Sequence, residues 1–166
     1  ITPLAAADRF VSLTLSRMPI SDINALSGLS GLTELTLSGL DISDISPLSG
    51  LTNLTVLHIS FNNISDISPL SGLTNLIFLE IGYNDIVDIS PLSGLTNLNT
   101  LFMGGNDRIG DISPLSGLTN LTGLSVGMQS IDDLSPLYGL KNLKHFYVDY
   151  STPFEVDNIK SDEQIK

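Results

Sequence analysis

The chain contains a ten-residue stretch, Ile45-Ser46-Pro47-Leu48-Ser49-Gly50-Leu51-Thr52-Asn53-Leu54, which returns almost unchanged along its length. The same motif starts again at Ile67, Ile89 and Ile112, and degenerate copies of it start at Ile23 and Leu134. A second set of apolar residues keeps the same interval: Leu13, Leu35, Leu57, Leu79 and Leu101 are 22 residues apart, Leu124 follows after 23 and Phe146 after 22. The chain is therefore built from a 22-residue unit that covers nearly all of its 166 residues.

A period of roughly 20–29 residues that contains Leu-x-x-Leu-x-Leu-x-x-Asn is the signature of a leucine-rich repeat, in which each unit forms one coil of a solenoid. One coil cannot bury its aliphatic side chains alone, so neighbouring coils must stack. The pattern predicts an α/β solenoid, a right-handed leucine-rich repeat superhelix with a parallel concave β-sheet and short 3₁₀ turns on the convex side. In one repeat we expect seven side chains to point inward: Leu35, Leu37, Ile42, Ile45, Leu48, Leu51 and Leu54.

The pattern divides the chain into three parts. Residues 1–10 are expected to form a short N-terminal cap, because the first coil has one uncovered apolar face. Residues 11–150 are the solenoid, with six repeats and a seventh strand. Residues 151–166 lose the pattern and are rich in charge, so we expect a C-terminal tail or linker there.

Local signals suggest how each coil turns. In Ser-Pro-Leu, the Ser is expected to cap a 3₁₀ turn that has Pro at its first position, and the Gly that follows is expected to end the turn with positive φ. On the other side of the strand, Asn62, Asn84 and Asn106 are expected to bond backbone groups of successive turns and form a ladder. The repeat from Leu101 carries one extra residue, which is expected to present Arg108 outward as a tolerated insertion.

One stretch of the sequence closely resembles the internalin-type repeats of bacterial surface proteins: Asn63-Ile64-Ser65-Asp66-Ile67-Ser68-Pro69-Leu70-Ser71-Gly72-Leu73-Thr74-Asn75-Leu76. The resemblance covers about residues 11–150. It implies a secreted or cell-surface bacterial protein that binds host or cell-surface proteins through the concave face. The resemblance does not extend to a partner or to the means of surface attachment.

The variable positions of the repeat support a binding surface. Side chains of a strand alternate, so the residues beside the inward leucines face the concave side, and these positions vary while the convex wording is nearly copied. Exposed aromatic clusters rimmed by polar groups are typical contact anchors. We therefore predict protein binding with four aromatic anchors, Phe61, Phe78, Tyr83 and Phe102, and with four residues that give polar selectivity, His58, Glu80, His145 and Tyr147.

Two other functions remain open. Near-identical repeats are also compatible with a structural scaffold or spacer domain within a larger surface protein. Aromatic residues near polar ones are compatible with glycan binding on the same face. Two of the anchors could also have a purely structural role, in which Phe61 and Tyr83 only pack against each other over the turn edge.

One aspartate recurs in each repeat, at Asp22, Asp44, Asp66, Asp88, Asp111 and Asp133. Hard cations favour clustered carboxylates, but calcium-binding repeats use several carboxylates per turn and this chain has one. The favoured interpretation is that each Asp bonds nearby backbone N–H groups as an Asx-turn. We therefore predict no metal site and no cofactor.

Other classes of function are disfavoured. A net charge of −11 argues against nucleic acid and anionic membrane surfaces, and no apolar run is long enough for membrane insertion. His58 and His145 should lie about 19 Å apart at ~4.8 Å per strand, so they cannot share a site, and Ser60 is expected to face solvent rather than act as a nucleophile. The chain has no cysteine. We expect a non-enzymatic monomer.

Overall fold

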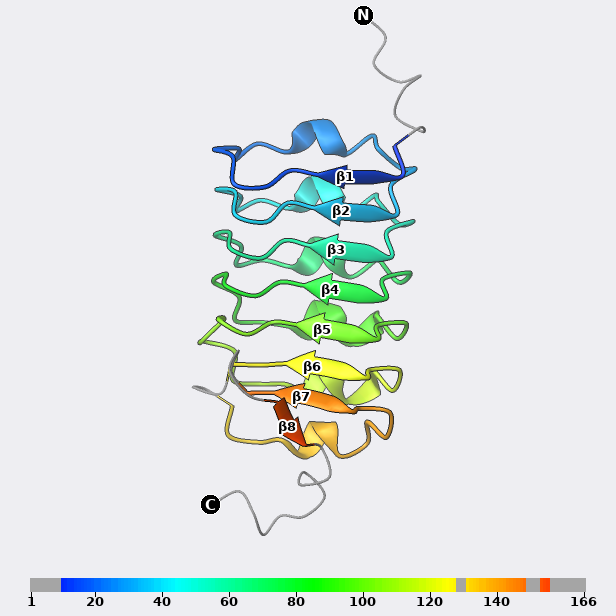
Figure 1. Cartoon of the computed structure of the whole chain (residues 1–166), viewed down its shortest axis with the longest axis vertical. Helices are drawn as coiled ribbons and strands as arrows, with labels where there is room; N and C mark the ends of the chain where they lie inside the picture. The colour runs from blue at the N-terminus through cyan, green and yellow to red at the C-terminus, as the bar shows by residue number, and fades with distance from the viewer. Residues whose placement is uncertain (1–9, 128–130, 149–152, 156–166) are drawn as a thin grey trace, which may run out of the picture.

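The computed structural model of the chain describes residues 10–127 and 131–148, and the backbone of residues 153–155. Within these ranges the chain winds into coils that stack along one axis, with one short strand in each coil (Figure 1). The strands of the described residues are β1 (Ser12–Thr14), β2 (Glu34–Thr36), β3 (Val56–His58), β4 (Phe78–Glu80), β5 (Thr100–Phe102), β6 (Gly123–Ser125), β7 (His145–Tyr147) and β8 (Pro153–Glu155).

The strands form a single sheet in chain order, from β1 to β8, and β1 to β7 run parallel. The 22-residue interval sets the register, because Leu35 pairs with Leu57 and Leu57 with Leu79. The extra residue of the fifth coil is absorbed outside the sheet, since Leu101 still pairs with Leu124. The predicted fold class, a leucine-rich repeat solenoid with a parallel sheet, is confirmed.

The opposite side of each coil is a 3₁₀ turn, as the sequence predicts. The described turns are η2 (Asn24–Leu26), η3 (Ser46–Leu48), η4 (Ser68–Leu70), η5 (Ser90–Gly94), η6 (Ser113–Gly117) and η7 (Ser135–Leu137). The expectation that Ser caps these turns is wrong. Ser46 is the first residue of its turn, and no side-chain cap bond is present at the preceding Ile45.

The aspartate column does the capping instead. Oδ1 of each Asp accepts the backbone N–H two residues later at 2.8 Å, from Asp22 through Asp44, Asp66, Asp88 and Asp111 to Asp133. This is the predicted Asx-turn. Three of these aspartates have a pKa below the usual value of 3.8: Asp44, Asp66 and Asp111. The main cause in each is the hydrogen bond from the backbone N–H of the Ser two residues later, and the second cause is the bond from the hydroxyl of the same Ser.

The expected positive φ at the glycines of the convex turns is also wrong. Left-handed backbone occurs instead just after the strands, at Arg17, Gly39, Phe61, Tyr83 and Gly105. The convex turns are 3₁₀ turns, which need right-handed φ, whereas the chain must reverse direction sharply where the strand ends.

The core is one continuous stripe of aliphatic side chains. All seven predicted inward residues of the repeat from Leu35 are at most 1% exposed. Each fully buried aliphatic side chain stabilises the fold by roughly 1.5–3 kcal/mol. Leu13 and Leu15 of the first coil are only partly buried, since β1 lies at the edge of the sheet and has one neighbouring strand among the described residues.

The predicted asparagine ladder is present beneath the turns that follow the strands. Asn84 is buried, and its Nδ2 donates to the carbonyls of Ile59 and Ile81, while its Oδ1 accepts the N–H of Ile64. Asn62 and Asn106 make the same set of contacts one coil earlier and later. Each amide therefore ties its own coil to the preceding one, where a turn would otherwise bury unpaired backbone groups.

The C-terminal part contains a strand that the sequence analysis did not predict. The tail or linker was expected from residue 151, but the backbone of Pro153–Glu155 forms β8, which pairs antiparallel with β7. This pairing covers the edge that β7 would otherwise expose. Most of the expected cap, residues 1–9, lies outside the described residues.

Replacing Asn84 with alanine should lower the free energy of unfolding by about 2–4 kcal/mol, because the N–H of Ile64 and the carbonyl of Ile59 lose a partner inside the solenoid. Urea unfolding followed by circular dichroism measures the change. Asn63→Ala is the control: Asn63 is exposed in the equivalent turn of the preceding coil, and its removal should change stability by no more than about 0.5 kcal/mol. Equal losses in the two variants would contradict the role of the ladder.

The Asx bonds should make the fold sensitive to acid. A carboxylate whose pKa is lowered on folding adds stability above its unfolded pKa, and this stability is lost as the pH falls below about 3.8. Asp66→Asn keeps an acceptor for the Ser68 N–H but removes the proton-binding group, so its unfolding free energy should fall less steeply between pH 4 and pH 2 than that of the wild type. The measurement is denaturant unfolding across this pH range. The control is Asp41→Asn, which removes an equal charge outside an Asx-turn.

Candidate functional site

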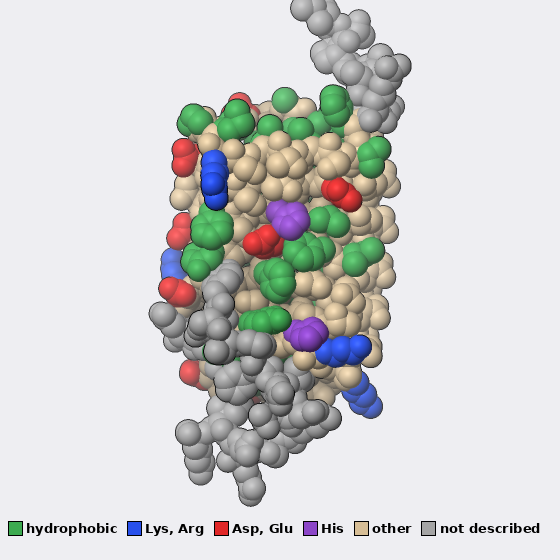
Figure 2. Space-filling model, in the orientation of Figure 1, with side chains coloured by type: hydrophobic (Ala, Val, Ile, Leu, Met, Phe, Trp, Pro, Cys, Tyr) green, Lys and Arg blue, Asp and Glu red, His purple; other side chains and the backbone are tan. Residues whose placement is uncertain are grey.

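The middle of the parallel sheet carries a cluster of four side chains, which we call the central cluster: His58, Phe78, Glu80 and Phe102. They come from three adjacent strands, β3, β4 and β5, with His58 opposite Glu80 and Glu80 opposite Phe102 in the register. The ring of Phe78 lies 4.8 Å from that of His58 and 5.6 Å from that of Phe102, the latter at 82°. Figure 2 shows hydrophobic side chains gathered on this face beside a histidine and an acidic side chain.

The His58–Glu80 pair gives the cluster its polar part. Nδ1 of His58 lies 2.6 Å from Oε2 of Glu80, and the two side chains are 31% and 29% exposed. A polar side-chain contact at this exposure stabilises the fold by no more than about 1 kcal/mol, because water competes with it. Its main effect is geometric, since it holds the imidazole beside the ring of Phe78, at a tilt of 39°.

Phe61 and Tyr83 form a separate pair at the end of the strands, which we call the turn stack. Their rings are stacked, with centroids 4.3 Å apart and planes 15° apart, and the side chains are 57% and 41% exposed. The structure therefore divides the four predicted anchors into two pairs, Phe78 with Phe102 on the strands and Phe61 with Tyr83 just after them. The contact between Phe61 and Tyr83 that a purely structural role predicts is present.

The turn stack occupies unfavourable backbone. Phe61 and Tyr83 have φ values of 59° and 53°, in the region that favours glycine, and the same position in neighbouring coils is Gly39 and Gly105. Left-handed backbone costs a residue with a Cβ roughly 1–2 kcal/mol. Gly105 makes room for the stack, because a Cβ there would lie 2.7 Å from Cδ1 of Tyr83.

The other two predicted residues lie apart from the central cluster. His145 is exposed and Tyr147 is partly buried, both on β7. The order of strands in the sheet separates β7 from β3 by three strands, so His58 and His145 do not share a site, as predicted. Between β5 and β7 the face is lined by Gly123 and Ser125, which are both buried.

Ser60 does not face solvent, so that expectation is wrong. Its side chain is 1% exposed, and its Oγ has no hydrogen-bond partner among the residues that the structure describes. An unpaired buried hydroxyl costs roughly 1–3 kcal/mol. The contact of His58 is with Glu80 rather than with Ser60, and the geometry offers no nucleophile–base pair there.

Metal binding finds no support in the described residues. Within residues 10–127 and 131–148, no group of three or more His, Asp or Glu side chains is arranged to hold a metal ion. The aspartates of the Asx-turns spend an oxygen each on a backbone N–H. The extra residue of the fifth coil leaves Arg108 exposed, as expected.

Sequence reasoning missed a second asparagine ladder. Nδ2 of Asn53, Asn75, Asn97, Asn120 and Asn142 donates to a backbone carbonyl of the preceding coil at 2.8–2.9 Å. The signal was the Asn in each Leu-x-Asn-Leu, where x is Thr in four repeats and Lys in the last, and this Asn recurs as regularly as that of the first ladder. It was overlooked because these residues are exposed polar groups after a convex turn.

Comparisons with known proteins agree with this architecture. The sequence pattern of the family described as leucine-rich repeats (2 copies) matches residues 31–72 and 74–117, more than half of the chain. The chain belongs to the leucine-rich repeat family. No curated protein matches it.

Solved structures identify the type of repeat. An internalin (InlF) of Listeria monocytogenes is 38% identical with a TM-score of 0.85, over 86% of this chain and 42% of the internalin. Internalin C2 of the same species is 44% identical with a TM-score of 0.79, over 81% of this chain and 59% of that protein. The repeats are thus of the bacterial internalin type, and the chain spans about half the length of these relatives.

A plant protein shares the fold at lower identity. The Arabidopsis receptor kinase HAESA, solved with the peptide hormone IDA and the co-receptor SERK1, is 27% identical with a TM-score of 0.70. The match covers 81% of this chain and 25% of the receptor.

Among the described residues of this chain, no helix has the length and apolarity needed to cross a membrane.

Replacing Gly105 with alanine should destabilise the fold by about 1–2 kcal/mol, since the new Cβ meets both left-handed backbone and the Tyr83 ring. The displaced ring should also weaken the near-ultraviolet circular dichroism of the turn stack. Gly94→Ala is the control, because a Cβ at Gly94 meets nothing within 4 Å. An unchanged melting temperature and spectrum in Gly105→Ala would contradict the packing described here.

Proposed function

We propose that this chain is a noncovalent protein-binding domain of a bacterial surface or secreted protein, and that it binds its partner on the concave face. The observation that carries the proposal is the central cluster. Phe78 lies between His58 and Phe102 on three adjacent strands, and all four side chains of the cluster remain partly accessible. Aromatic groups beside polar ones are typical of interface centres, which are enriched in aromatic residues.

In this proposal each predicted residue has a role. Phe78 and Phe102 bury apolar surface against the partner, and Phe61 and Tyr83 extend the contact to the turn edge. His58 and Glu80 contribute direction and polar selectivity. His145 and Tyr147 contact the partner two strands beyond Phe102.

Two findings support binding rather than catalysis. The side chains that contact His58 among the described residues are Glu80 and Phe78, and neither of them carries a hydroxyl or thiol nucleophile. The related plant receptor was solved in complex with a peptide hormone and a co-receptor, so a solenoid of this fold can bind protein ligands. We therefore propose a non-enzymatic domain that acts as a monomer, outside the bacterial cell.

The test is a capture experiment with the immobilised 166-residue chain and extracts of bacterial and host cell surfaces. The double variant Phe78→Ala/Phe102→Ala should lose the captured partner, as identified by mass spectrometry. Its melting curve should change little, because the two rings are only partly buried and their edge contact contributes about 0.5–1.5 kcal/mol.

The control variant is Val87→Ala. Val87 is an exposed apolar residue in the segment that leads from the turn to η5, away from the sheet. It should capture the partner as the wild type does. Equal capture by the double variant and the wild type contradicts the concave site, and empty capture from every extract favours the spacer function.

A further inference from the structure

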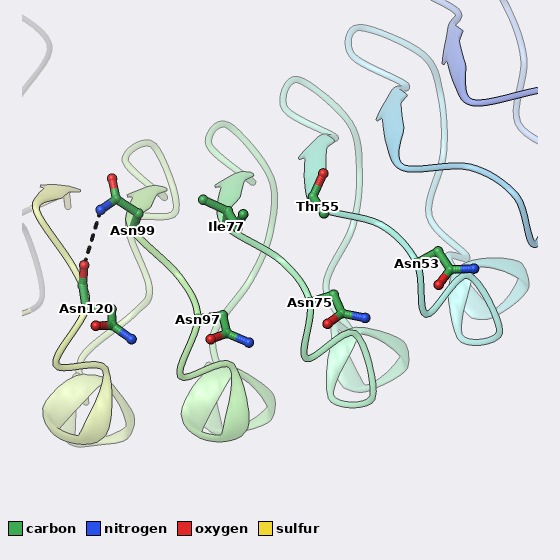
Figure 3. A pocket seen from close by; sticks show the side chains of 7 residues that line it. All are labelled: Asn53, Thr55, Asn75, Ile77, Asn97, Asn99 and Asn120. Carbon is green, nitrogen blue, oxygen red and sulfur yellow. Dashed lines mark hydrogen bonds between the residues drawn. The ribbon is translucent and has the colours of Figure 1, made fainter.

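A groove of about 550 Å³ runs along one flank of the solenoid, between the ends of the 3₁₀ turns and the starts of the strands. Seven side chains line it: Asn53, Thr55, Asn75, Ile77, Asn97, Asn99 and Asn120. Figure 3 shows four of the asparagines in a row along the turns, with Thr55, Ile77 and Asn99 in a second row beside the strands. We call this feature the flank groove.

The amides of the row are only partly used by the fold. Asn53, Asn75, Asn97 and Asn120 each donate one Nδ2 bond to a carbonyl of the preceding coil. Their Oδ1 atoms accept no hydrogen bond from the described residues, and one N–H of each amide also remains. Each of these four amides can therefore offer one N–H donor and one Oδ1 acceptor to a ligand.

The second row gives the groove a defined end and an apolar centre. Asn99 makes more bonds than the turn asparagines, since its Oδ1 accepts hydrogen bonds from the hydroxyls of Thr100 and Thr122 and its Nδ2 donates to the carbonyl of Asn120. In the middle lies Ile77, which is 49% exposed. The equivalent position is Thr33, Thr55 and Thr122 in other coils, so the isoleucine departs from the local polar pattern.

The flank groove is uncharged although the chain has a net charge of −11. A charged ligand would be desolvated there without an opposite charge to pair with. The lining therefore favours a neutral ligand that carries both donors and acceptors and has a small apolar surface for Ile77.

We propose that the flank groove binds a neutral oligosaccharide, laid along the solenoid axis. Sugar hydroxyls donate and accept at once, so a pair on one ring can bond both the Oδ1 and the remaining N–H of one asparagine. The C–H face of a sugar ring can cover Ile77. The asparagines recur once per coil, so a glycan laid along the axis presents successive sugar units to successive amides.

The proposal differs from protein binding on the sheet, because the flank groove shares no residue with the central cluster or the turn stack. Either proposal can fail without the other.

The experiment is a titration of the isotope-labelled 166-residue chain with cellohexaose, chitohexaose and maltohexaose, followed by NMR. At least one of them should cause saturable shifts in the side-chain amide signals of Asn53, Asn75, Asn97 and Asn120 and in the signals of Ile77. No shifts with any of the three at millimolar concentration, or shifts confined to the sheet residues, would overturn the proposal.

A charge placed in the groove tests the site itself. Ile77→Lys introduces a cation at an exposed position without removing a ladder bond, and it should weaken binding by about tenfold or more. Val87→Lys is the matched control, since Val87 is similarly exposed, at 44%, but lies outside the groove. Both variants should melt like the wild type, and equal affinity of the two for the hexasaccharide would overturn the assignment.

Discussion

The stacking of each coil on the next is the constraint on which the rest of this molecule depends. A 22-residue coil has too few aliphatic side chains to enclose a core, so residues such as Leu57 and Leu79 are buried only because an equivalent residue lies on either side. The buried amides of Asn62, Asn84 and Asn106 add hydrogen bonds to backbone carbonyls of the preceding coil. Together they require each coil to have nearly the same path, which is why the inward and convex positions are almost copied along the chain.

The same constraint frees the outward positions of the sheet. These side chains are not needed to hold neighbouring coils together, so His58, Phe78, Glu80 and Phe102 can differ from their equivalents without disturbing the leucines beneath them. Because the strands keep register, the four residues nevertheless meet at ring separations of 4.8 and 5.6 Å. A rigid stack thus holds a variable set of side chains in a defined arrangement, which is the property expected of a binding scaffold.

Sequence reasoning succeeded where a residue's environment repeats. The inward leucines, the 3₁₀ turns, the Asx-turns and the first asparagine ladder all follow from a local pattern seen several times over. It failed where the outcome depends on how the chain bends or what covers a residue. The left-handed backbone was assigned to the convex glycines, yet it lies at Phe61 and Tyr83, because the sharpest turn follows the strand. Ser60 was expected to face solvent, and its burial depends on neighbours that alternation alone does not reveal.

By itself, the sequence determined the fold class, the register of the parallel strands and the identity of the core, because periodic burial leaves one way to stack 22-residue coils. Only the tertiary structure decided how the outward residues combine: Phe61 with Tyr83, Phe78 with His58 and Phe102, and Pro153–Glu155 beside β7. The reason is that core positions repeat in a single dimension along the chain. Surface contacts depend instead on side-chain directions and on distances between coils, which no one-dimensional pattern contains.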